Sequence, residues 1–588
     1  MERIGVFLCH CDLSPLQPAA TEEVVAIIGG YPGVVYTEIC PDMCMHPDLE
    51  QVKGVVREMT LDGVVLTTCS SSLHGSAFHQ VVASTGLAAH RIEVVDLKQR
   101  QTQSVTTGGE TSVGEAINLI KNAIDKLGRE YYGPAVKIPV TKRALVIGGG
   151  VAGLQAALDI ADGGYEVVLV EKSPSIGGHM LQYSEVFPTL DCPQCIMTPK
   201  MVDVAQHPNI TLLTYAEVEG VRGTAGNFEV DILQKARKVD HSKCTGCGSC
   251  WKKCPEKVPS EYDAGVANRT AIYIPFAQAV PSKPVIDTEH CRYIKYLQFI
   301  DEKREGKKPP KCLICEKLCP TGAIDWEQQP QLLTEKFGGI VVATGFDLMP
   351  VKDIQEYAED PDIINGIQFE RILCPGGPTN GAVVRPSDGK KVKEAVFVSC
   401  VGSRDPEQGV PYCSRVCCMY LVKQAMLYRH AVPDGQAHIF YIDTRITGKG
   451  YEEFVQRAVD DGVLYLRGKV SKIFRDGDQL SVWGVDTLSG HRVEVSCDLV
   501  VLGMAMVPSP GVKDLARKLG ILTDEYGFIV ERHPKLCPLE TSVPGVYLAG
   551  TAQGPKDIPD SVAQASGAAG KVLSLLSRDE VAEELVVG

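Results

Sequence analysis

The sequence predicts an α/β protein in which two dinucleotide-binding (Rossmann-type) units follow a smaller α/β domain, with a ferredoxin-like insert in the first unit. Three observations predict this class. Strand-like and helix-like stretches alternate through residues 3–97 and again from residue 143 onward, as parallel sheets covered by helices require. A G-x-G-x-x-G turn begins at Gly148, directly after a strand-like stretch. Cysteines beside prolines interrupt the second alternation at residues 236–335, which is typical of bacterial ferredoxins.

The first domain is predicted from four strand-like stretches, "RIGVFLC", "GVVYTEIC", "DGVVLTTC" and "RIEVVDL". Three of them end in a cysteine. Because the carboxyl ends of parallel strands share one edge of an open sheet, thiols from different strands converge there. We expect a [4Fe–4S] cluster at this edge, held by Cys9, Cys40, Cys44 and Cys69. Cys11 is a fifth cysteine that can replace one of the four.

The turn in "VIGGGVAGLQAAL" has the glycines of a dinucleotide site. Gly148 would make the tight turn, Gly150 would let a pyrophosphate approach, and Gly153 would let the helix pack closely on the strand. The next strand-like stretch, "YEVVLVEK", reaches an acid at Glu171. A carboxylate at that point can accept hydrogen bonds from ribose hydroxyls. The whole unit therefore predicts nucleotide binding.

Three later segments favour FAD over NAD, namely "EKSPSIGGHM", "IVVATGFD" and "GVYLAGTAQG". This trio resembles the two-dinucleotide-domain flavoproteins, to which thioredoxin reductase belongs, and in that family the corresponding segments wrap FAD. The resemblance covers residues 143–235 and 336–575. One departure is Thr551, which stands where the family usually has an acid near the FAD ribitol. The expected cofactor-binding residues are Gly148, Gly150, Gly153, Glu171, Lys172, Gly177, Gly178, Thr344, Gly345, Gly550 and Gln553.

The insert contains "KCTGCGSCWKKCP", the bacterial ferredoxin run C-x2-C-x2-C-x3-C-P. A second run, "KCLICEKLCP", lacks its first cysteine because Pro309 stands there, and Cys291 is the nearest substitute. A zinc site needs only four ligands and leaves the repeated Cys-Pro pattern unexplained. We therefore expect two clusters in which the last cysteine of each run reaches the neighbouring cluster. The expected ligands are Cys244, Cys247, Cys250 and Cys319 for one cluster, and Cys254, Cys291, Cys312 and Cys315 for the other.

The second Rossmann-type unit carries cysteines where a nicotinamide site would carry glycines. Its first strand and turn, "VFVSCVGSRD", lack the G-x-G-x-x-G pattern. The helix that follows begins in "SRVCCMYLVKQAML", and the exposed N–H groups of a first helical turn favour an anion such as a thiolate-ligated cluster. We expect a further [4Fe–4S] cluster here, with buried structural thiols as the alternative. Its ligands would be Cys400, Cys413, Cys417 and Cys418.

A separate C-x-x-C pair, Cys192 and Cys195 in "LDCPQCIMTP", lies in the FAD half of the chain. Such spacing is compatible with a redox dithiol, with two ligands of a cluster completed by outside partners, or with a turn packed on FAD. The sequence does not choose among these three.

The motifs divide the chain into six segments. Isolated cysteines such as Cys374, Cys497 and Cys537 fall outside the motifs and are expected to be small packing residues. The segments are an N-terminal α/β iron–sulfur domain at 1–135, FAD-binding parts at 141–235, 336–389 and 506–588, a two-cluster ferredoxin insert at 236–335, and a second Rossmann-like domain at 390–505.

Composition excludes several classes of protein. A formal charge of −14 argues against nucleic-acid binding, which usually needs a basic face. No apolar run approaches the roughly 18 residues of a membrane span, and "MERIGVFLCHCD" lacks a signal-peptide pattern. We therefore expect a cytoplasmic protein. The 22 cysteines favour metal ligation over disulfides, because cytosolic thiols stay reduced.

Taken together, these parts resemble the A subunits of heterodisulfide reductases over nearly the whole chain. The motifs that carry the resemblance are the N-terminal cysteine domain, "DCPQCIMTPKM", the ferredoxin insert within an FAD domain, and "PYCSRVCCMYLVKQA". The family implies FAD and several [4Fe–4S] clusters, about four by the motifs here. It also implies ligation of a cluster by the four cysteines of the second unit. Many relatives continue into a further two-cluster ferredoxin domain, whose cysteines this sequence does not contain.

The family resemblance also suggests a role for Lys423, which would lie near the reactive edge of the isoalloxazine. A cation there would stabilise reduced flavin. Glu370, in "IQFERIL", is a weaker candidate for tuning the flavin, and a surface acid is the alternative.

The resemblance implies an oxidoreductase of anaerobic metabolism that performs flavin-based electron bifurcation between a disulfide-type acceptor and ferredoxin. Its expected partners are the disulfide-reducing and iron–sulfur subunits of the same complex, an electron donor linked to hydrogenase or formate dehydrogenase, and ferredoxin, arranged as a dimer of heteromers. The alternatives are a non-bifurcating, quinone-interacting electron-transfer protein and an NAD(P)H-dependent disulfide reductase using Cys192 and Cys195. A scaffold with structural zinc is a third.

Overall fold

The structure is a computed structural model that divides into two compact units. The first comprises Met1–Ile138, Arg532–Pro538 and Glu580–Gly588, and the second comprises Pro139–Glu531 and Leu539–Asp579. In the described part of the chain, no helix combines the length and apolar character that crossing a membrane requires. The described residues are 3–10, 16, 18–41, 43, 50–68, 78, 82, 84–88, 91–97, 113–129, 131–132, 136–301, 309–350, 354, 357, 359–583 and 586–587.

The first unit is built on a parallel sheet with strand order β2-β1-β3-β4, formed by β1 (Ile4–His10), β2 (Val34–Pro41), β3 (Gly63–Thr68) and β4 (Ile92–Asp96). Its helices are α1 (Pro18–Gly29), α2 (Glu50–Glu58) and α4 (Val113–Arg129). Alternate side chains of β1 point to opposite faces, so Val6 and Leu8 pack with α1 and α4, whereas Phe7 and Cys9 pack with α2. Two short pairs complete the unit, β5 (Tyr131–Tyr132) with β30 (Val586–Val587) and β6 (Val136–Pro139) with β29 (Glu580–Glu583).

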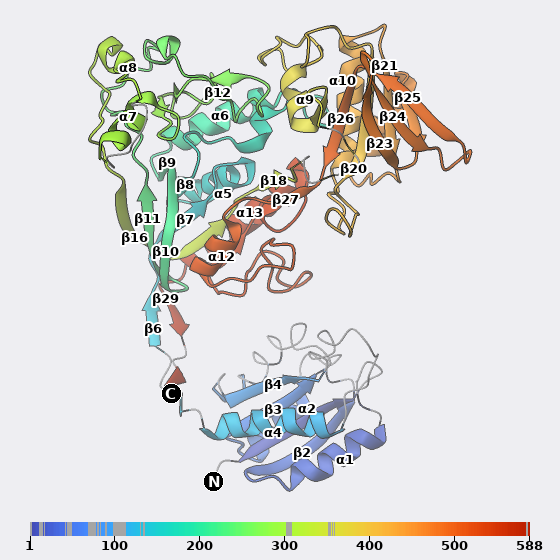
Figure 1. Ribbon diagram of the computed structural model, residues 1–588. Coiled ribbons are helices and arrows are strands. Elements are labelled where there is room, and N and C mark those ends of the chain that lie inside the picture. Colours follow the sequence, from blue (N-terminus) through green and yellow to red (C-terminus); the bar gives the residue numbers. More distant parts are fainter. Residues whose placement is uncertain are drawn as a thin grey trace. The chain divides into compact units, whose positions relative to one another are not determined.

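The second unit contains the first Rossmann-type sheet, whose strands come from three separate stretches of the chain. The sheet is parallel, in the order β28-β17-β7-β8-β9, and consists of β7 (Arg143–Ile147), β8 (Glu166–Glu171), β9 (Ile210–Thr214), β17 (Gly339–Val342) and β28 (Val546–Leu548). Helices α5 (Val151–Asp162) and α13 (Ile558–Leu576) pack against each other and this sheet, and α6 (Pro193–Gln206) packs beside α5 (Figure 1).

The other face of this sheet is covered by an antiparallel sheet of β10 (Ala216–Thr224), β11 (Asn227–Gln234) and β16 (Gln331–Phe337), together with α12 (Val512–Leu519). The cysteine-rich insert leaves the sheet after β11 and returns at β16. Because β16 pairs with β11 from Gln331 onward, the sheet resumes slightly before the boundary expected at residue 335.

The insert has little regular structure and a small apolar core. Its elements are η4 (Trp251–Lys253), β12 (Val258–Pro259), β13 (Asn268–Arg269), β14 (Ile272–Tyr273), β15 (Val285–Ile286), α7 (Arg292–Asp301) and α8 (Ile314–Leu318). The buried core of Val239, Ile272, Ile286, Ile294 and Ala323 is surrounded by cysteines. A core of this size supplies little stability by itself, and natural domains of this kind add metal or other cross-links.

The second Rossmann-like domain has a parallel sheet in the order β19-β26-β20-β21-β22, formed by β19 (Ile363–Asn365), β20 (Glu394–Val401), β21 (Gln436–Tyr441), β22 (Leu464–Arg467) and β26 (Leu499–Met504). One apolar core joins it to α9 (Gly366–Leu373), α10 (Cys417–Ala431) and α11 (Tyr451–Asp460). A second core joins it to the antiparallel sheet of β23 (Val470–Asp476), β24 (Gln479–Val485) and β25 (Arg492–Cys497) (Figure 1).

The two Rossmann-type domains are connected by an antiparallel pair, β18 (Phe346–Leu348) and β27 (Met506–Pro508). The predicted fold class is confirmed by these sheets. One detail differs from the expected segment at 336–389: β19 pairs with β26, and α9 packs in the core of the second domain. The chain therefore joins the second sheet well before residue 390.

Candidate flavin and iron–sulfur sites

A cavity of about 790 Å³ lies in the second unit and is walled by three parts of the chain. The glycine-rich turn after β7 contributes Gly148 and Gly150. The ferredoxin insert contributes aromatic side chains such as Tyr262. The second Rossmann-like domain contributes Lys423 and Gln424. A cavity of this size is suited to a large cofactor.

The three glycines of the turn meet different constraints. Gly148 has φ of 108°, and a Cβ on it would lie 2.3 Å from the carbonyl oxygen of Ala343. A Cβ on Gly153 would lie 1.7 Å from the carbonyl oxygen of Gly148, so helix α5 packs directly on the turn. Gly150, the N-cap of α5, has nothing within 4 Å of its ideal Cβ position. The helix N-terminus is therefore open to a phosphate group.

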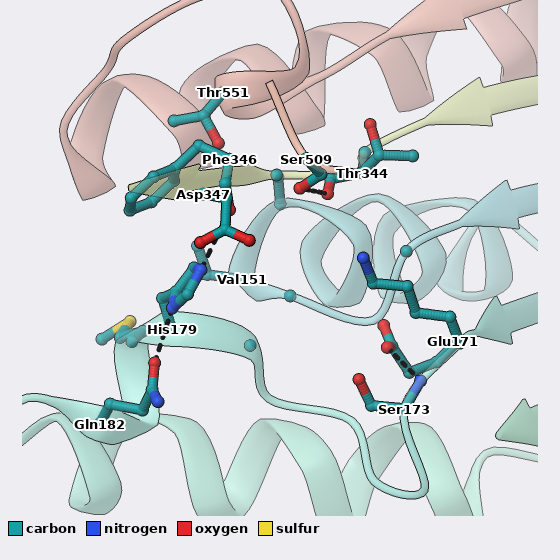
Figure 2. A pocket seen from close by; sticks show the side chains of 18 of the residues that line it. Val151, Glu171, Ser173, His179, Gln182, Thr344, Phe346, Asp347, Ser509 and Thr551 are labelled. Carbon is teal, nitrogen blue, oxygen red and sulfur yellow. Dashed lines mark hydrogen bonds between the residues drawn. The ribbon is translucent and has the colours of Figure 1, made fainter. Parts of the chain in front are cut away.

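Glu171, at the carboxyl end of β8, lies at one end of the residues drawn in Figure 2. Its carboxylate accepts hydrogen bonds from the backbone N–H groups of Gly149 and Ser173, both at 2.7 Å. These bonds fix its orientation beside the cavity. The remaining lone pairs of the two oxygens can still accept hydrogen bonds from ribose hydroxyls.

Thr344 lies after β17, close to Ser509 in Figure 2. Its carbonyl oxygen accepts a hydrogen bond from Ser509 Oγ at 2.8 Å. Its hydroxyl oxygen, by contrast, is buried without a hydrogen-bond partner among the described residues, although Thr344 lines the cavity. Buried hydroxyls are normally paired. A bound cofactor would supply the missing partner, so the residues present fit FAD.

The predicted cofactor-binding residues divide into two groups. Seven of them line the cavity, namely Gly148, Gly150, Glu171, Lys172, Gly178, Thr344 and Gly345. The other four are Gly153, Gly177, Gly550 and Gln553. Gln553 Oε1 accepts hydrogen bonds from Gln564 Nε2 at 2.7 Å and from Lys556 Nζ at 2.8 Å, and Lys556 lines the cavity. The binding role of each residue stays a prediction.

The sequence reasoning missed several charged residues of the cavity wall, among them Asp347 and Lys556. Asp347 lines the cavity, as Thr551 does, and brings a carboxylate to the wall in which the family's usual acid is replaced. It ends the segment "IVVATGFD", so its position in a cofactor motif was the available signal. Lys556 also lines the cavity, and burial, followed by the neighbouring Arg415, lowers its pKa to about 8.

Lys423 and Glu370 form a buried ion pair at the cavity wall. Their side chains are each 2% exposed, so the alternative that Glu370 is a surface acid is wrong. Lys423 Nζ donates to Glu370 Oε1 and to the carbonyl oxygen of Glu185, the latter at 2.7 Å. Glu370 Oε2 accepts from the backbone N–H of Ser184 at 2.9 Å. Gln424 Nε2 donates to Glu370 Oε1 as well, so three groups donate hydrogen bonds to this carboxylate.

One predicted cluster site in the insert encloses a cavity of its own. Cys254, Cys291, Cys312 and Cys315 all line a pocket of about 20 Å³, and all four are free thiols. The structure thus brings Cys291 to the other three, as expected for a substitute for the missing first cysteine of the second run. The assignment of these thiols as ligands stays a prediction.

The other predicted site of the insert is grouped less tightly. Cys250 lies near Cys244 and Cys247, and burial raises its pKa to about 11. Cys319 packs against the same small core as Cys244 and Cys250, and its Sγ accepts a hydrogen bond from the Ala323 N–H at 3.2 Å.

The cysteines of the second Rossmann-like domain gather where β20 meets α10. Cys400, near the end of β20, has φ of 63°, a conformation uncommon outside glycine. Cys417 is hydrogen-bonded to both Cys400 and Cys418, which raises the pKa of its thiol well above the usual value. Cys413 and Cys400 both lie near the Arg404 guanidinium. The four predicted ligands therefore share one location.

In the first unit, Cys9 and Cys40 are direct partners across the parallel strands β1 and β2. Both are buried, and burial raises the pKa of the Cys40 thiol to about 12. The other predicted ligands of this cluster, Cys44 and Cys69, lie outside the described residues, as does Cys11.

Over the described residues, no three His, Cys, Asp or Glu side chains lie close enough to share one metal ion. A [4Fe–4S] cubane differs from a single ion because each thiolate binds its own iron, so the four sulfurs lie farther apart. The arrangement of the thiols is therefore compatible with cubane ligation.

Cys192 and Cys195 lie at the start of α6 and do not belong to these groups. Both are exposed, and neither lines the flavin cavity. Cys192 is the N-cap of α6, and its Sγ accepts the backbone N–H of Cys195 at 3.3 Å. Of the three interpretations left open by the sequence, a turn packed on FAD is therefore not supported.

Comparison with known protein families agrees with this geometry. The FAD binding domain family matches residues 143–185, which include the glycine turn and Glu171. The 4Fe-4S binding domain family matches residues 237–260, which contain the first ferredoxin run. Among solved structures, a thioredoxin reductase of T. acidophilum is 14% identical, with a TM-score of 0.41 over 74% of this chain and 99% of that chain.

Relatives of known name match the whole chain. The A subunit of the H(2):CoB-CoM heterodisulfide,ferredoxin reductase of Methanothermobacter thermautotrophicus is 41% identical over 100% of this chain and 87% of that protein. The iron-sulfur A subunit of the CoB--CoM heterodisulfide reductase of Methanocaldococcus jannaschii is 41% identical over 99% and 87%. The A subunit of the H(2)/formate:CoB-CoM heterodisulfide,ferredoxin reductase of Methanococcus maripaludis is 40% identical over 99% and 87%. The chain therefore belongs to the family of heterodisulfide reductase A subunits and is an FAD-dependent iron–sulfur oxidoreductase.

Proposed function

We propose that this protein is the flavin-based, electron-bifurcating component of a heterodisulfide reductase-like complex, with a disulfide-type acceptor on one branch and ferredoxin on the other. The observation that carries the proposal is the three-part wall of the flavin cavity. The FAD domain, the ferredoxin insert and the cysteine-bearing second domain all contribute to it, so two domains with predicted one-electron carriers adjoin the cofactor site. When bound, FAD accepts electron pairs and releases single electrons, which links the two kinds of carrier.

The second domain supports cluster binding over nicotinamide binding. The turn after β20 lacks the second and third glycines that let a pyrophosphate approach a helix N-terminus, and its place is taken by the gathered thiols of Cys400, Cys417 and Cys418. About four [4Fe–4S] clusters are proposed in all, two in the insert, one here and one in the first unit. The names of relatives that mention H2, formate and ferredoxin support external partners of these kinds.

Lys423 and Glu370 are proposed to set the local charge at the cavity wall. As a pair they are neutral overall, and their burial means that water screens them poorly. Removing either one leaves a single charge beside the cofactor. A remaining cation favours the addition of electrons to bound flavin, whereas a remaining anion opposes it.

The test is to measure the two-electron potential of bound FAD in Lys423→Met and Glu370→Gln. Lys423→Met should lower the potential and Glu370→Gln should raise it, each by about 30 mV, which is equivalent to about 1.4 kcal/mol. The double variant Lys423→Met/Glu370→Gln should lie near the native value, because it carries no net charge there. Lys391→Met is a control, since Lys391 forms an exposed ion pair with Asp434 and does not line the cavity, and it should leave the potential unchanged.

The bifurcation step itself is tested in the purified anaerobic complex. Reduction of a disulfide acceptor should be obligatorily coupled to reduction of ferredoxin, and NADPH alone should not bleach the flavin. If disulfide reduction proceeded at the same rate without ferredoxin, the protein would be an iron–sulfur flavoprotein that does not bifurcate electrons. If the flavin potential shifted in the same direction and by the same amount in Lys423→Met and Glu370→Gln, the proposed role of the ion pair would be contradicted.

A further inference from the structure

Among the residues that the structure describes, the two cysteines of "DCPQC" form an accessible thiol pair outside the cluster motifs. Cys192 and Cys195 are both exposed free thiols. Cys192 Sγ accepts the backbone N–H of Cys195, and a hydrogen bond to Cys192 raises the pKa of the Cys195 thiol. The two sulfurs therefore face each other across the first turn of α6, a helix of 14 residues.

Contacts on both sides hold this turn in place. Between the cysteines, Gln194 donates its Nε2 to Tyr262 Oη of the ferredoxin insert at 3.1 Å. Just before them, the Val186 N–H donates to the carbonyl oxygen of Asp191 at 3.0 Å, and Leu190 is held at φ of 59°. Val186 and Tyr262 line the flavin cavity. The turn that carries the two cysteines is thus hydrogen-bonded to residues of the cavity wall, while both cysteines are exposed to solvent.

This arrangement separates Cys192 and Cys195 from the predicted cluster ligands. Seven of the eight predicted cluster cysteines of the insert, all but Cys247, pack in or beside a cysteine-rich core. Cys192 and Cys195 are exposed, and in the described part of the chain Cys192 is the only cysteine that affects the Cys195 thiol. A thiol pair at C-x-x-C spacing on a helix N-terminus is suited to reversible disulfide formation, because that helix end favours a thiolate.

We propose that Cys192 and Cys195 form a redox-active dithiol that exchanges electrons with an external disulfide. The Cys192 thiolate attacks one sulfur of the disulfide RSSR, forming a mixed disulfide and releasing one RS⁻. Cys195 then loses its proton and attacks Cys192, which forms the Cys192–Cys195 disulfide and releases the second RS⁻. In balance, the protein dithiol is oxidised by two electrons, RSSR is reduced to two RSH, and the two protons pass from protein to product. This inference goes beyond the proposed bifurcation and does not depend on it.

The first test equilibrates the anaerobic native protein with mixtures of oxidised and reduced glutathione, blocks free thiols, and follows each cysteine by peptide mass spectrometry. Cys192 and Cys195 should become oxidised together, as one two-electron transition. Cys537→Ser supplies the matched control, since Cys537 is a partly exposed cysteine outside every proposed cluster, and this variant should show the same transition. A pair that stays reduced in excess oxidised glutathione would overturn the proposal.

The second test identifies the attacking thiol and the source of the disulfide. Cys195→Ser should trap a stable mixed disulfide at Cys192. In Cys192→Ser, a mixed disulfide should form at least about tenfold more slowly. A glutathione disulfide and a disulfide-bonded protein such as insulin are offered separately, so the trapped adduct shows whether small or protein disulfides are accepted. Equal labelling of Cys192 and Cys537 in the Cys195→Ser protein would contradict a tuned dithiol. Neither readout uses ferredoxin, so failure here is distinct from failure of bifurcation.

Discussion

At the scale of single residues, two glycines of one turn bear different demands. Gly153 is a packing glycine, because a Cβ there would lie 1.7 Å from the carbonyl oxygen of Gly148. Gly150 is an access glycine, because its ideal Cβ meets no protein atom within 4 Å. Position 153 requires glycine because a larger residue would clash within the protein. Position 150 requires glycine only if a ligand approaches the turn closely.

Substitution by alanine should separate the two demands. Gly153→Ala should lower the stability of the flavin-free protein by about 1–3 kcal/mol, the usual cost of overpacking. Gly150→Ala should leave that stability within about 0.5 kcal/mol but should weaken FAD binding. Thermal unfolding of the flavin-free proteins and flavin content after reconstitution measure the two effects. Full FAD content in Gly150→Ala would contradict a pyrophosphate at this position.

His241 gives the ferredoxin insert a dependence on pH. Burial lowers its pKa to about 4, and its Nε2–H donates to the carbonyl oxygen of Pro284 at 3.1 Å. In unfolded protein the pKa is about 6.5, so between these values the unfolded state binds more protons. The stability contributed by neutral His241 is therefore complete above about pH 6.5 and is lost as pH falls toward 4.

The expected result is that His241→Gln narrows the difference in urea midpoint of the insert between pH 7.5 and pH 5. Cluster absorbance under anaerobic conditions reports the unfolding. His491→Gln, at an exposed position in the second domain, should behave as the native protein does. An unchanged pH difference in His241→Gln would show that other groups cause the acid sensitivity.

Residues also show how far sequence reasoning extends. Gly148, Gly150 and Glu171 could be predicted as a group because their roles depend on local spacing. The Lys423–Glu370 pair could not, because α9 and α10 are brought together only by packing in the second domain. The sequence left Glu370 undecided between a tuning residue and a surface acid, and burial is a property of the packed helices rather than of the segment "IQFERIL".

At the scale of elements, the cysteine runs could be predicted from the sequence, but the residue that completes the second run could not. The run at 244–254 has its own spacing signature. The second run depends on Cys291, which comes 21 residues before Cys312 and carries no motif. The structure places Cys291 just before α7 and against the same small pocket as Cys254, Cys312 and Cys315. The expected domain boundaries at residues 335 and 390 differ from the observed ones for a similar reason. The pairing of β16 with β11 and of β19 with β26 joins strands that are distant in the sequence.

Replacement of Cys291 should therefore affect one cluster and leave the other. In Cys291→Ser the iron content of the anaerobic protein should fall by about one to four atoms per chain, and the electron paramagnetic resonance signal of one reduced cluster should change or disappear. Cys374→Ser, at a buried cysteine outside the motifs, should keep the native iron content. Unchanged iron and unchanged spectra in Cys291→Ser would exclude Cys291 as a ligand.

At the scale of the whole molecule, the flavin cavity is formed by three parts of the chain rather than by one domain. The strand β17 brings Thr344, the insert brings Tyr262 and Phe276, and α9 and α10 bring Glu370 and Lys423. The insert is further bound to η3 (Gly178–Gln182) by hydrogen bonds from Gln182 Nε2 to the carbonyl oxygens of Glu261 and Tyr262 at 3.1 and 3.0 Å. A ligand that fills the cavity must therefore stabilise all three parts together.

This coupling predicts a specific pattern of hydrogen exchange. A ligand present at about 100 times its dissociation constant stabilises the state that binds it by about 2.7 kcal/mol. With FAD bound, amide exchange should slow together in the glycine turn, in residues 260–276 of the insert and at the N-termini of α9 and α10, because each of these segments lines the cavity. The parallel sheet β1–β4 of the first unit is the internal control and should exchange at the same rate with and without FAD. Protection confined to the glycine turn would mean that the insert and the second domain are not coupled to the cofactor, and the single-electron routes that the proposed function needs would then lack a common centre.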